Sequence, residues 1–358
     1  MRVLVVNAGS SSLKLSELDD DDRVLLERDF DSTDARLVDA IRDLNDIDAV
    51  GHRIVHGGSR YRQSVRIDGA VIRYLSSITD LAPLHLPASL AGIERVSAVL
   101  GDVPAVACFD TMFHSTMPAT ASTYAIPEEW RERHGIMRYG FHGFSHAYAA
   151  RRAAEIMRRP PGGLRVVTCH LGSGASLAAV LGGRSMDTTM GFTPLEGVVM
   201  ATRSGTVDPG AMLYLMRHAH LSEPQLTDAL DRKGGLLALA GTPDMREVLR
   251  RRDSGDPAAQ LAFDVYVYRL RAAIASMTAA LGGLDALVFT GGVGENSPEV
   301  RSAAAAGLLF LGIEVDGPTN STAGEDRDVS AAHATVRTLV VHAREDVEVA
   351  REVRRVLS

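Results

Sequence analysis

The 358-residue sequence is poor in lysine and cysteine and has no long apolar run. Its two cysteines, Cys108 and Cys169, lie in apolar stretches whose spacing matches neither a disulfide framework nor a zinc site. The sequence contains no run of about eighteen apolar residues, the length that a membrane-spanning helix requires. The N-terminus offers only the four apolar residues Val3–Val6, much shorter than a signal-peptide core. We therefore expect a cytoplasmic protein without a membrane partner.

Lysine occurs only at Lys14 and Lys233, so nearly all the positive charge is arginine, and the net charge is −7. This negative balance argues against a general nucleic-acid-binding protein, because affinity for the phosphate backbone comes from basic surfaces. An anionic small substrate would need locally placed cations instead. Planar guanidinium groups suit that task, since they hold phosphate and carboxylate oxygens well.

Apolar runs typical of strands alternate with helical patterns, which predicts an α/β protein. A chain of this length usually divides into domains with separate cores, so we expect two. The expected strands are Val3–Val6, Ala49–Val55, Val103–Phe109, Arg165–Cys169, Ala286–Thr290 and Thr335–His342. The expected helices are Leu84–Leu100, Phe144–Arg158, Pro257–Leu281 and an amphipathic tail, Glu345–Leu357.

An internal repeat supports two halves. The first half opens with VLVVNAGSSSLKL and the second with VVTCHLGSGASLAAV, and each reads as a strand, a small-residue turn and a second strand. Pro160-Pro161 followed by Gly162-Gly163 is the strongest break between them, so we expect the domain boundary near it, a little upstream. The cleft between the halves is the expected site.

Three turns combine small residues with hydrogen-bonding groups, as anion sites do: residues 7–12 with Lys14, residues 170–176, and residues 290–296. The third is expected to precede a helix that opens at Pro298, which favours nucleotide contact at a helix N-terminus. A plain hairpin is an equally good interpretation of the first turn alone. None matches a Walker A loop or a GxGxxG fingerprint.

Polar residues are embedded in several apolar runs near these turns, where clustering favours a functional role. They are His52, Arg53, His56, Asp110, His114, His142, His146 and Arg203. A zinc hydrolase is disfavoured because HExxH and close ligand pairs are missing. The acidic run Asp19–Asp22 is interpreted as a solvated hairpin turn.

Taken together, the motifs resemble the acetate kinase (acetokinase) family of short-chain carboxylate kinases, within the acetate and sugar kinase, Hsp70 and actin superfamily. The resemblance runs from Asn7 to Glu345. The segments that carry it, in the family's order and approximate spacing, are NAGSSSLK, GHRIVHGG, FDTMFHSTMP, YGFHG, HLGSGAS, DTTMGFTPLEG, TRSG and GGVGENS. The positions that depart from the family pattern are Ser173 and Leu86, where Asn is usual, Thr206, where Asp is usual, and Met245, where an aromatic residue is usual.

The resemblance implies an α/β fold of two duplicated actin-like (ribonuclease H-like, βββαβαβα) domains facing a central cleft. The N-terminal domain would comprise residues 1–148 and 348–358, and the nucleotide-binding domain residues 149–347. The resemblance also implies a cytoplasmic homodimer that acts on acetate or acetyl phosphate with ATP or ADP. Mg²⁺ would be the metal, and Mn²⁺ could substitute.

The resemblance also implies residue roles. Arg53 and Arg203 would grip the carboxylate and the transferring phosphoryl group, and His142 would stabilise the transition state, assisted by His85 and His170. The catalytic set would be Asp110, His142, Arg203 and Arg53, with Asn7, Asp110 and Glu345 organising the metal and Arg53, Val55, Leu84, Phe141 and Pro194 binding the substrate. The ATP-binding residues would be Lys14, His170, Gly172, Ser173, Gly174, Asp244, Met245, Arg246, Gly292, Val293, Gly294 and Asn296.

These residue types suit the chemistry. A carboxylate attacking ATP brings two anions together, so cations must neutralise charge spread over the phosphoryl oxygens. The carboxylate is already deprotonated at pH 7 and needs no general base, which assigns Asp110 to metal binding and positioning. Three alternatives stay open: a propionate or other short-chain carboxylate kinase, a donor other than ATP, and a non-catalytic actin-like nucleotide-binding protein.

Overall fold

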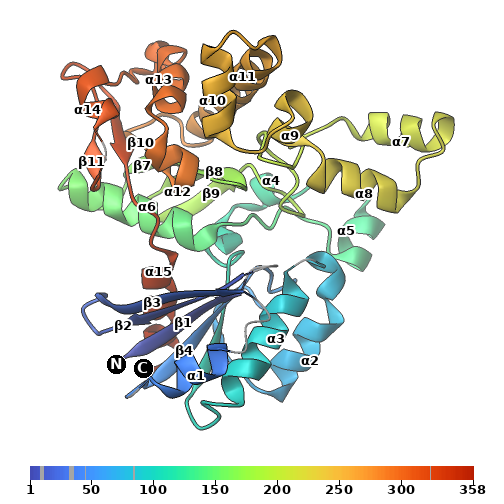
Figure 1. Ribbon diagram of the computed structural model, residues 1–358, viewed down its shortest axis with the longest axis vertical. Helices are drawn as coiled ribbons and strands as arrows, with labels where there is room; N and C mark the ends of the chain where they lie inside the picture. The colour runs from blue at the N-terminus through green and yellow to red at the C-terminus, as the bar shows by residue number, and fades with distance from the viewer. Residues whose placement is uncertain (9–11, 32–35, 45, 84, 323) are drawn as a thin grey trace. The chain divides into compact units, whose positions relative to one another are not determined.

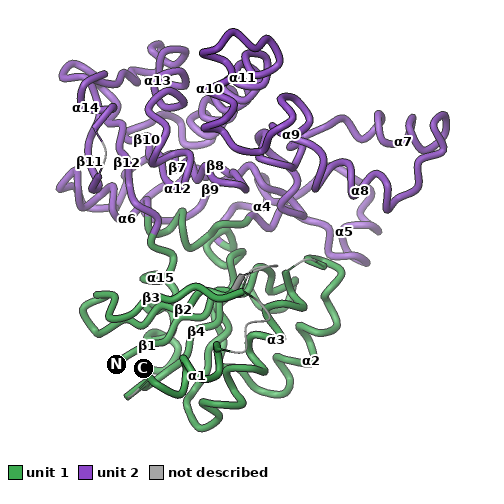
Figure 2. Tube along the Cα trace, viewed as in Figure 1, with its two compact units in different colours: residues 1–115, 141–148, 344–358 green, residues 116–140, 149–343 purple. Residues whose placement is uncertain are grey.

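The computed structural model describes residues 1–358 apart from residues 9–11, 32–35, 45, 84 and 323. The chain divides into two compact units (Figure 2). Unit 1 comprises residues 1–115, 141–148 and 344–358, and unit 2 comprises residues 116–140 and 149–343. The predicted domains share most residues with these units but place residues 116–140 and 344–347 differently, and as domain bounds they stay a prediction.

Unit 1 contains a mixed sheet whose order, among the described residues, is β3-β2-β1-β4-β6-β5; β1 to β4 are labelled in Figure 1. Its strands are β1 (Val3–Ala8), β2 (Ser12–Leu18), β3 (Val24–Asp31), β4 (Ala49–Ile54), β5 (Val65–Arg66) and β6 (Ala105–Phe109). Strands β1, β4 and β6 are parallel, whereas β2, β3 and β5 run antiparallel to their neighbours.

Helices cover both faces of this sheet. The helices of the unit are α1 (Arg36–Arg42), α2 (Gly69–Ser77), η1 (Thr79–Leu81), α3 (Leu86–Ser97), η2 (Phe113–Thr116, whose last residue belongs to unit 2) and α15 (Glu345–Leu357). Because side chains alternate along a strand, Val3 and Val5 pack with α15 on one face, and Leu4 and Val6 pack with α1 and α3 on the other. Both faces are apolar, as expected for strands buried between helices.

Unit 2 repeats this arrangement with a sheet of order β11-β12-β10-β7-β8-β9. Its strands are β7 (Arg165–Leu171), β8 (Ala175–Leu181), β9 (Arg184–Thr188), β10 (Ala286–Thr290), β11 (Arg327–Asp328) and β12 (Arg337–Val340). An antiparallel meander, β7 to β9, is followed by parallel β10 and β12, as in unit 1. The predicted internal repeat is therefore confirmed.

The longest helix of unit 2, α11, packs along β7, β8 and β9. The helices assigned to this unit are α4 (Ala119–Ser122), α5 (Glu128–His134), α6 (Gly143–Ile156, which begins in unit 1), α7 (Pro209–His218), α8 (Glu223–Arg232), α9 (Gly235–Ala240), α10 (Met245–Asp253), α11 (Pro257–Ala280), α12 (Gly291–Asn296), α13 (Pro298–Ala306), η3 (Leu309–Leu311) and α14 (Gly317–Ser321). Strand β10 is buried along its whole length, so it forms the centre of the unit 2 core.

The predicted elements are present with small shifts at their ends, and β10 and α15 have the predicted bounds. The turn expected at residues 290–296 is different, because residues 291–296 form helix α12 directly after β10. Gly291 makes this possible: its φ is +78°, and a Cβ there would lie 2.9 Å from the carbonyl oxygen of Leu171. The predicted helix at Pro298 follows as α13.

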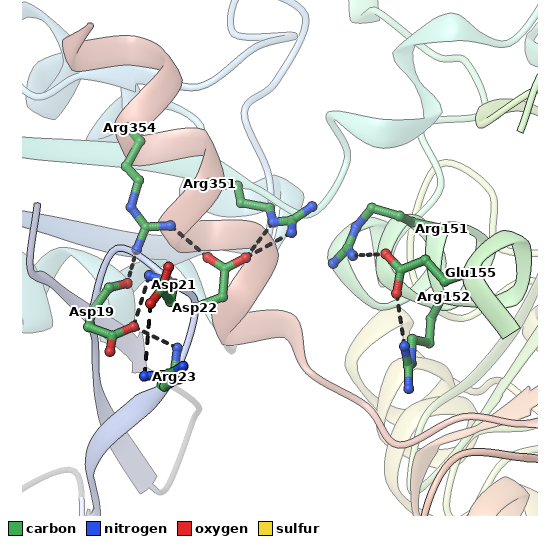
Figure 3. Close-up of polar contacts among 9 residues, drawn as sticks. All are labelled: Asp19, Asp21, Asp22, Arg23, Arg151, Arg152, Glu155, Arg351 and Arg354. Carbon is green, nitrogen blue, oxygen red and sulfur yellow. Dashed lines mark hydrogen bonds and ion pairs between the residues drawn. The ribbon is translucent and has the colours of Figure 1, made fainter. Parts of the chain in front are cut away.

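The acidic run Asp19–Asp22 forms the predicted turn between β2 and β3, but Asp22 is not simply solvated. Its carboxylate accepts hydrogen bonds from Arg351 at 2.8 Å and Arg354 at 2.6 Å, both on α15 (Figure 3). These ion pairs attach the turn to the helix that covers the sheet. Within α6, Glu155 pairs in the same way with Arg151 and Arg152 (Figure 3).

Both cysteines are buried and unpaired. In the described part of the chain, no helix combines the length and the apolar character needed to cross a membrane.

The close packing of α15 on β4 gives a testable prediction. A Cβ on Gly51 would lie 2.7 Å from Val353 and 2.8 Å from Val349, so Gly51→Ala forces the helix away from the sheet. We expect the free energy of unfolding to fall by about 1–3 kcal/mol, measured by urea denaturation. The control is Gly162→Ala, because nothing lies within 4 Å of a Cβ at Gly162. Equal stability of the two variants would contradict this packing.

Candidate functional site

Three polar residues lie at neighbouring strand ends in unit 1. Asn7 is near the end of β1, Arg53 is near the end of β4, and Asp110 follows β6. Parallel pairing places Asn7 opposite Arg53 and Ile54 opposite Phe109, so the three lie at the same edge of the sheet. All three alternate onto the face covered by α15. Carboxyl-terminal strand edges are where open α/β sheets usually bind ligands.

Arg53 connects these groups. Its Nε donates to Asp110 Oδ1 at 3.0 Å, its Nη2 donates to the other carboxylate oxygen, and its Nη1 donates to Asn7 Oδ1 at 2.9 Å. Glu345, the first residue of α15, places Oε2 3.3 Å from the same Nε. The structure therefore brings the predicted Asn7, Arg53, Asp110 and Glu345 together. It also shows Arg53 bonded to protein groups, where the sequence suggested contact with substrate.

The charges in this cluster do not cancel. One guanidinium faces two carboxylates, and the Asp110 side chain is only 1% exposed. Burial, together with repulsion from Glu345, raises the pKa of Asp110 to about 6 despite the attraction of Arg53. Burial alone would lower the pKa of Arg53, but Asp110 and Glu345 outweigh it and raise that pKa. Arg53 is thus permanently charged, and the cluster carries an excess negative charge when Asp110 is ionised.

This donor set suits a hard divalent cation. Asn7, Asp110 and Glu345 present amide and carboxylate oxygens, which Mg²⁺ prefers in proteins. The excess negative charge and the raised pKa of Asp110 both indicate that a further positive charge would stabilise the cluster. The residues present therefore fit a bound divalent cation.

His142 immediately precedes α6 and has a φ of +57°, an uncommon conformation for a residue other than glycine. The backbone around it is fixed on both sides. The Phe141 carbonyl accepts a hydrogen bond from His114 Nε2 at 3.0 Å, and the Gly143 N–H donates to the Asp110 carbonyl at 3.0 Å. Asp110 and His142 are therefore connected through the backbone within unit 1, at a backbone geometry typical of functional sites.

Other predicted residues of unit 1 surround this cluster. Val55 and Phe141 are buried, and His56 contacts the Phe141 ring edge-on at 5.6 Å. Burial lowers the pKa of His56 and His114 to about 4, so both imidazoles are neutral at physiological pH. His85 lies at the N-cap position of α3. Leu84, predicted for the substrate pocket, lies outside the described residues.

Lys14 lies opposite Asn7 on β2, but its ammonium forms an ion pair with Glu27 on β3. Burial lowers and Glu27 raises the pKa of Lys14, with a net increase. The predicted contact of Lys14 with ATP stays a prediction, because the charge is already paired within the sheet.

In unit 2, the predicted turns meet at the ends of β7 and β10. His170 pairs with Thr290 across these strands, and a Cβ on Gly172 would lie 3.7 Å from His170 Nε2 and 4.0 Å from the Gly292 nitrogen. Ser173 is exposed, and its carbonyl accepts a hydrogen bond from Ala201 at 3.1 Å. The β7–β8 turn, α12 and the segment that carries Arg203 are therefore neighbours.

The remaining residues predicted to bind ATP lie in two parts of unit 2. Gly292, Val293, Gly294 and Asn296 belong to α12. Gly292 and Asn296 share its exposed face, where Asn296 Nδ2 donates to the Gly292 carbonyl at 2.9 Å. Asp244 caps α10 and pairs with Arg246 at 2.7 Å, whereas Met245 is only 3% exposed. Met245 thus contributes to the core of unit 2, and its predicted contact with the base stays a prediction.

Arg203 differs from Arg53 in its surroundings. Its Nη1 donates to the Pro194 carbonyl at 2.8 Å. Among the described residues, no carboxylate lies within ion-pair distance of it. Burial lowers its pKa, and the attraction of Asp231 offsets this only partly. A guanidinium has five N–H donors, so Arg203 is a partly buried cation able to receive an anion.

Thr206 keeps a hydrogen-bonding role at a position where the resemblance implies aspartate. Its hydroxyl accepts from the Gly197 N–H at 3.1 Å, and its own N–H donates to the Gly197 carbonyl at 2.9 Å. These two bonds close the segment that contains Arg203. Tyr124 and Arg138, which contact the same loop, were not predicted from the sequence. The only signal was the position of Arg138 directly before the YGFHG motif.

Comparisons with known proteins agree with the resemblance to the acetokinase family. The model of the acetokinase family matches residues 32–351. The acetate kinases of Trichormus variabilis and Gloeobacter violaceus are 50% and 51% identical over 313 and 314 residues, which are 87% of this chain and 77% of each relative. The crystal structure of the Porphyromonas gingivalis acetate kinase has a TM-score of 0.91 at 34% identity and covers 100% of both chains. A propionate kinase from Francisella tularensis also reaches 0.91 at 34% identity, covering 99% of both chains.

A sugar-bound ROK family protein from Streptococcus pneumoniae shares the fold alone, with a TM-score of 0.50 at 12% identity. With the repeated sheet order of the two units, these likenesses confirm the predicted fold class: an α/β protein of two duplicated actin-like halves. The cleft between the halves stays a prediction.

The different surroundings of the two arginines predict different effects on stability. Arg53→Ala leaves the buried Asp110 and the partly buried Glu345 without their counter-charge, so we expect a loss of about 3–5 kcal/mol. Arg203→Ala removes a cation that has no carboxylate partner among the described residues, so we expect a change of about 1 kcal/mol or less in either direction. Urea denaturation of both variants would test this. An equal loss in the two would contradict the assigned charge balance.

Proposed function

We propose that this chain, which belongs to the acetokinase family, transfers the γ-phosphoryl group of ATP to acetate and forms acetyl phosphate and ADP reversibly. Membership of the family makes it a phosphotransferase with a carboxyl group as acceptor. The observation that carries the proposal within the chain is Arg203, a partly buried guanidinium without a carboxylate partner in the described structure. Such a group is suited to the charge that develops on a transferring phosphoryl group.

The proposed reaction is a direct in-line attack. The acetate carboxylate is ionised at neutral pH and attacks phosphorus without a general base. Arg203 and His142 would donate to the phosphoryl oxygens, assisted by His170. The positive-φ backbone of His142, fixed on both sides by hydrogen bonds, supports this role because it requires no reorganisation during the reaction.

Arg53 would act mainly in the architecture of the site. Its N–H groups hold Asn7, Asp110 and Glu345 in place, and its charge offsets part of theirs. The glycine-rich backbone of residues 172–174 and 291–294 would approach the phosphates of ATP, because glycine lets backbone N–H groups come close to an anion. Val55, Phe141 and Pro194 would enclose the methyl group of acetate.

We propose Mg²⁺ as the metal, with Mn²⁺ as a substitute. Asn7, Asp110 and Glu345 would hold it directly or through water, with Arg53 keeping the carboxylates oriented. When bound, the ion would neutralise phosphate charge and orient the nucleotide. A cytoplasmic location and a homodimer remain part of the proposal, on the resemblance alone.

Propionate is the second candidate acceptor. A solved propionate kinase matches this chain as well as an acetate kinase does, with the same TM-score and identity. One methylene contributes only about 1–3 kcal/mol of discrimination, so small changes in the pocket decide between the two. A donor other than ATP is suggested by Ser173 and Met245, which depart from the family pattern.

Activity tests the proposal directly. With Mg-ATP and acetate, the wild-type enzyme should form acyl phosphate, trapped as the hydroxamate, and Arg203→Ala should lower turnover by about 10²-fold or more. Arg53→Ala should reach a similar loss per folded molecule. Propionate, butyrate and pyrophosphate, assayed in parallel, identify acceptor and donor. The control is Arg217→Ala on the exposed surface of α7, which should retain full turnover.

ATP binding without acyl phosphate from any carboxylate would favour the non-catalytic alternative. Full turnover in Arg203→Ala would remove the central role proposed for that residue.

The metal site gives a pH-dependent prediction that needs no activity. Because the pKa of Asp110 is raised to about 6, its contribution to stability is present below about pH 4 and is lost as pH rises through about 6. Mg²⁺ should restore this loss, so it should raise the melting temperature more at pH 7.5 than at pH 5.5. Asp110→Asn should reduce the Mg²⁺ effect, and the exposed Asp264→Asn should not. A shift that depends on neither pH nor Asp110 would contradict this site.

A further inference from the structure

A second polar network in unit 2 surrounds the loop between β9 and α7. It consists of Tyr124, which follows α4, Arg138, which follows α5, and Glu196 in the loop itself. We call these three residues the clasp. Residues 189–208 of the loop form neither helix nor strand, so hydrogen bonds from outside the loop must fix its path.

Arg138 makes most of these bonds. Its Nη1 donates to three successive carbonyls, those of residues 188, 189 and 190, at 3.1, 3.2 and 3.1 Å. Its Nη2 donates to Glu196 Oε1 at 2.7 Å, and its side chain is only 17% exposed. One guanidinium thus joins the beginning of the loop to a carboxylate seven residues further along it.

Tyr124 completes the clasp. Its hydroxyl donates to the other oxygen of Glu196 and accepts from the Phe192 N–H at 3.0 Å. Burial and Glu196 both raise the pKa of Tyr124, which keeps the hydroxyl protonated and able to donate. Gly191 allows this contact, because a Cβ there would lie 1.8 Å from Glu196 Oε2 and 2.1 Å from the Tyr124 hydroxyl.

Pro194 lies in the loop between Phe192 and Glu196, which the clasp holds, and its carbonyl accepts the 2.8 Å hydrogen bond from Arg203. On the far side of Pro194, the paired bonds between Gly197 and Thr206 close the segment that carries Arg203. The positions of Pro194 and of the guanidinium therefore follow from the path of one loop. A cavity of about 360 Å³, lined in part by Arg138, Glu196 and Thr206, lies beside this loop and leaves room for it to shift.

We propose that Tyr124, Arg138 and Glu196 are positioning residues that fix Pro194 and Arg203 and so set the preference for acceptor length. This inference rests on the proposed carboxylate kinase function. A partly buried ion pair is a weak source of stability, since desolvation offsets much of its Coulomb energy. Such a network instead affects the precise positions of the residues that it holds, and reactivity depends on sub-ångström differences in those positions.

The test is Tyr124→Phe, which removes one hydroxyl and leaves the ring. The Phe192 N–H loses its acceptor and Glu196 keeps only its bond from Arg138, so the loop can move toward the cavity. We expect the KM for acetate to rise roughly tenfold and the preference for acetate over propionate to change several-fold, with the KM for ATP unchanged. Steady-state assays with both acceptors measure this. The control is Tyr268→Phe, where the side chain is 66% exposed on α11.

Gly191→Ala is the second variant, because its methyl group would press on the same contact from the other side. It should change the KM for acetate and the acceptor preference in the same direction as Tyr124→Phe does. It takes the place of Tyr124→Phe in the test if that variant does not fold. A lower kcat in equal proportion for both acceptors, with unchanged KM, would show a merely structural clasp and overturn the inference. Wild-type values in both variants would overturn it too. A wild-type enzyme that phosphorylates no carboxylate would instead reject the proposed function, and the inference with it.

Discussion

The structure of unit 1 depends on one guanidinium shared by two carboxylates. Arg53 can bond Asp110 and Glu345 together only because β4 lies between β1 and β6 in parallel register and because α15 begins at the same edge of the sheet. The excess negative charge that results is costly in a buried cluster and is relieved by a proton or a metal ion. The N-terminus of α15 adds a favourable dipole for Glu345.

Arg53 and Arg203 were expected to act alike, but their surroundings differ in charge. Arg53 is compensated by Asp110 and Glu345, so it stabilises the folded protein and has little capacity left for a ligand. Arg203 donates to a carbonyl and has no carboxylate partner among the described residues, so it is suited to bind an anion. In the proposed reaction, this uncompensated charge would lie where transition-state charge develops, and part of its desolvation cost is met when the protein folds.

The sequence predicted the features that rest on local patterns. Strand β10 and helix α15 were predicted with their bounds because an uninterrupted apolar run and a 3.6-residue apolar period identify them. Helix α12 was missed, since three glycines in residues 291–294 argue against a helix until Gly291 is seen to turn the chain. The pairing of Arg53 with Asp110 depends on strand register, and the clasp joins Tyr124 and Arg138 to the distant Glu196. Neither has a local signal.

Duplication explains why one chain has two kinds of strand-end chemistry. Asn7 opposite Arg53 in unit 1 corresponds to His170 opposite Thr290 in unit 2, because β1 and β4 match β7 and β10 in sheet order. The first pair is surrounded by carboxylates, whereas the second is followed by glycine-rich backbone at residues 172–174 and 291–294. A charged edge suits a cation and a backbone-rich edge suits phosphate oxygens. Under the proposed function, divergence of the two edges would separate metal binding from phosphate binding, and a reaction between ATP and an anionic acceptor requires both.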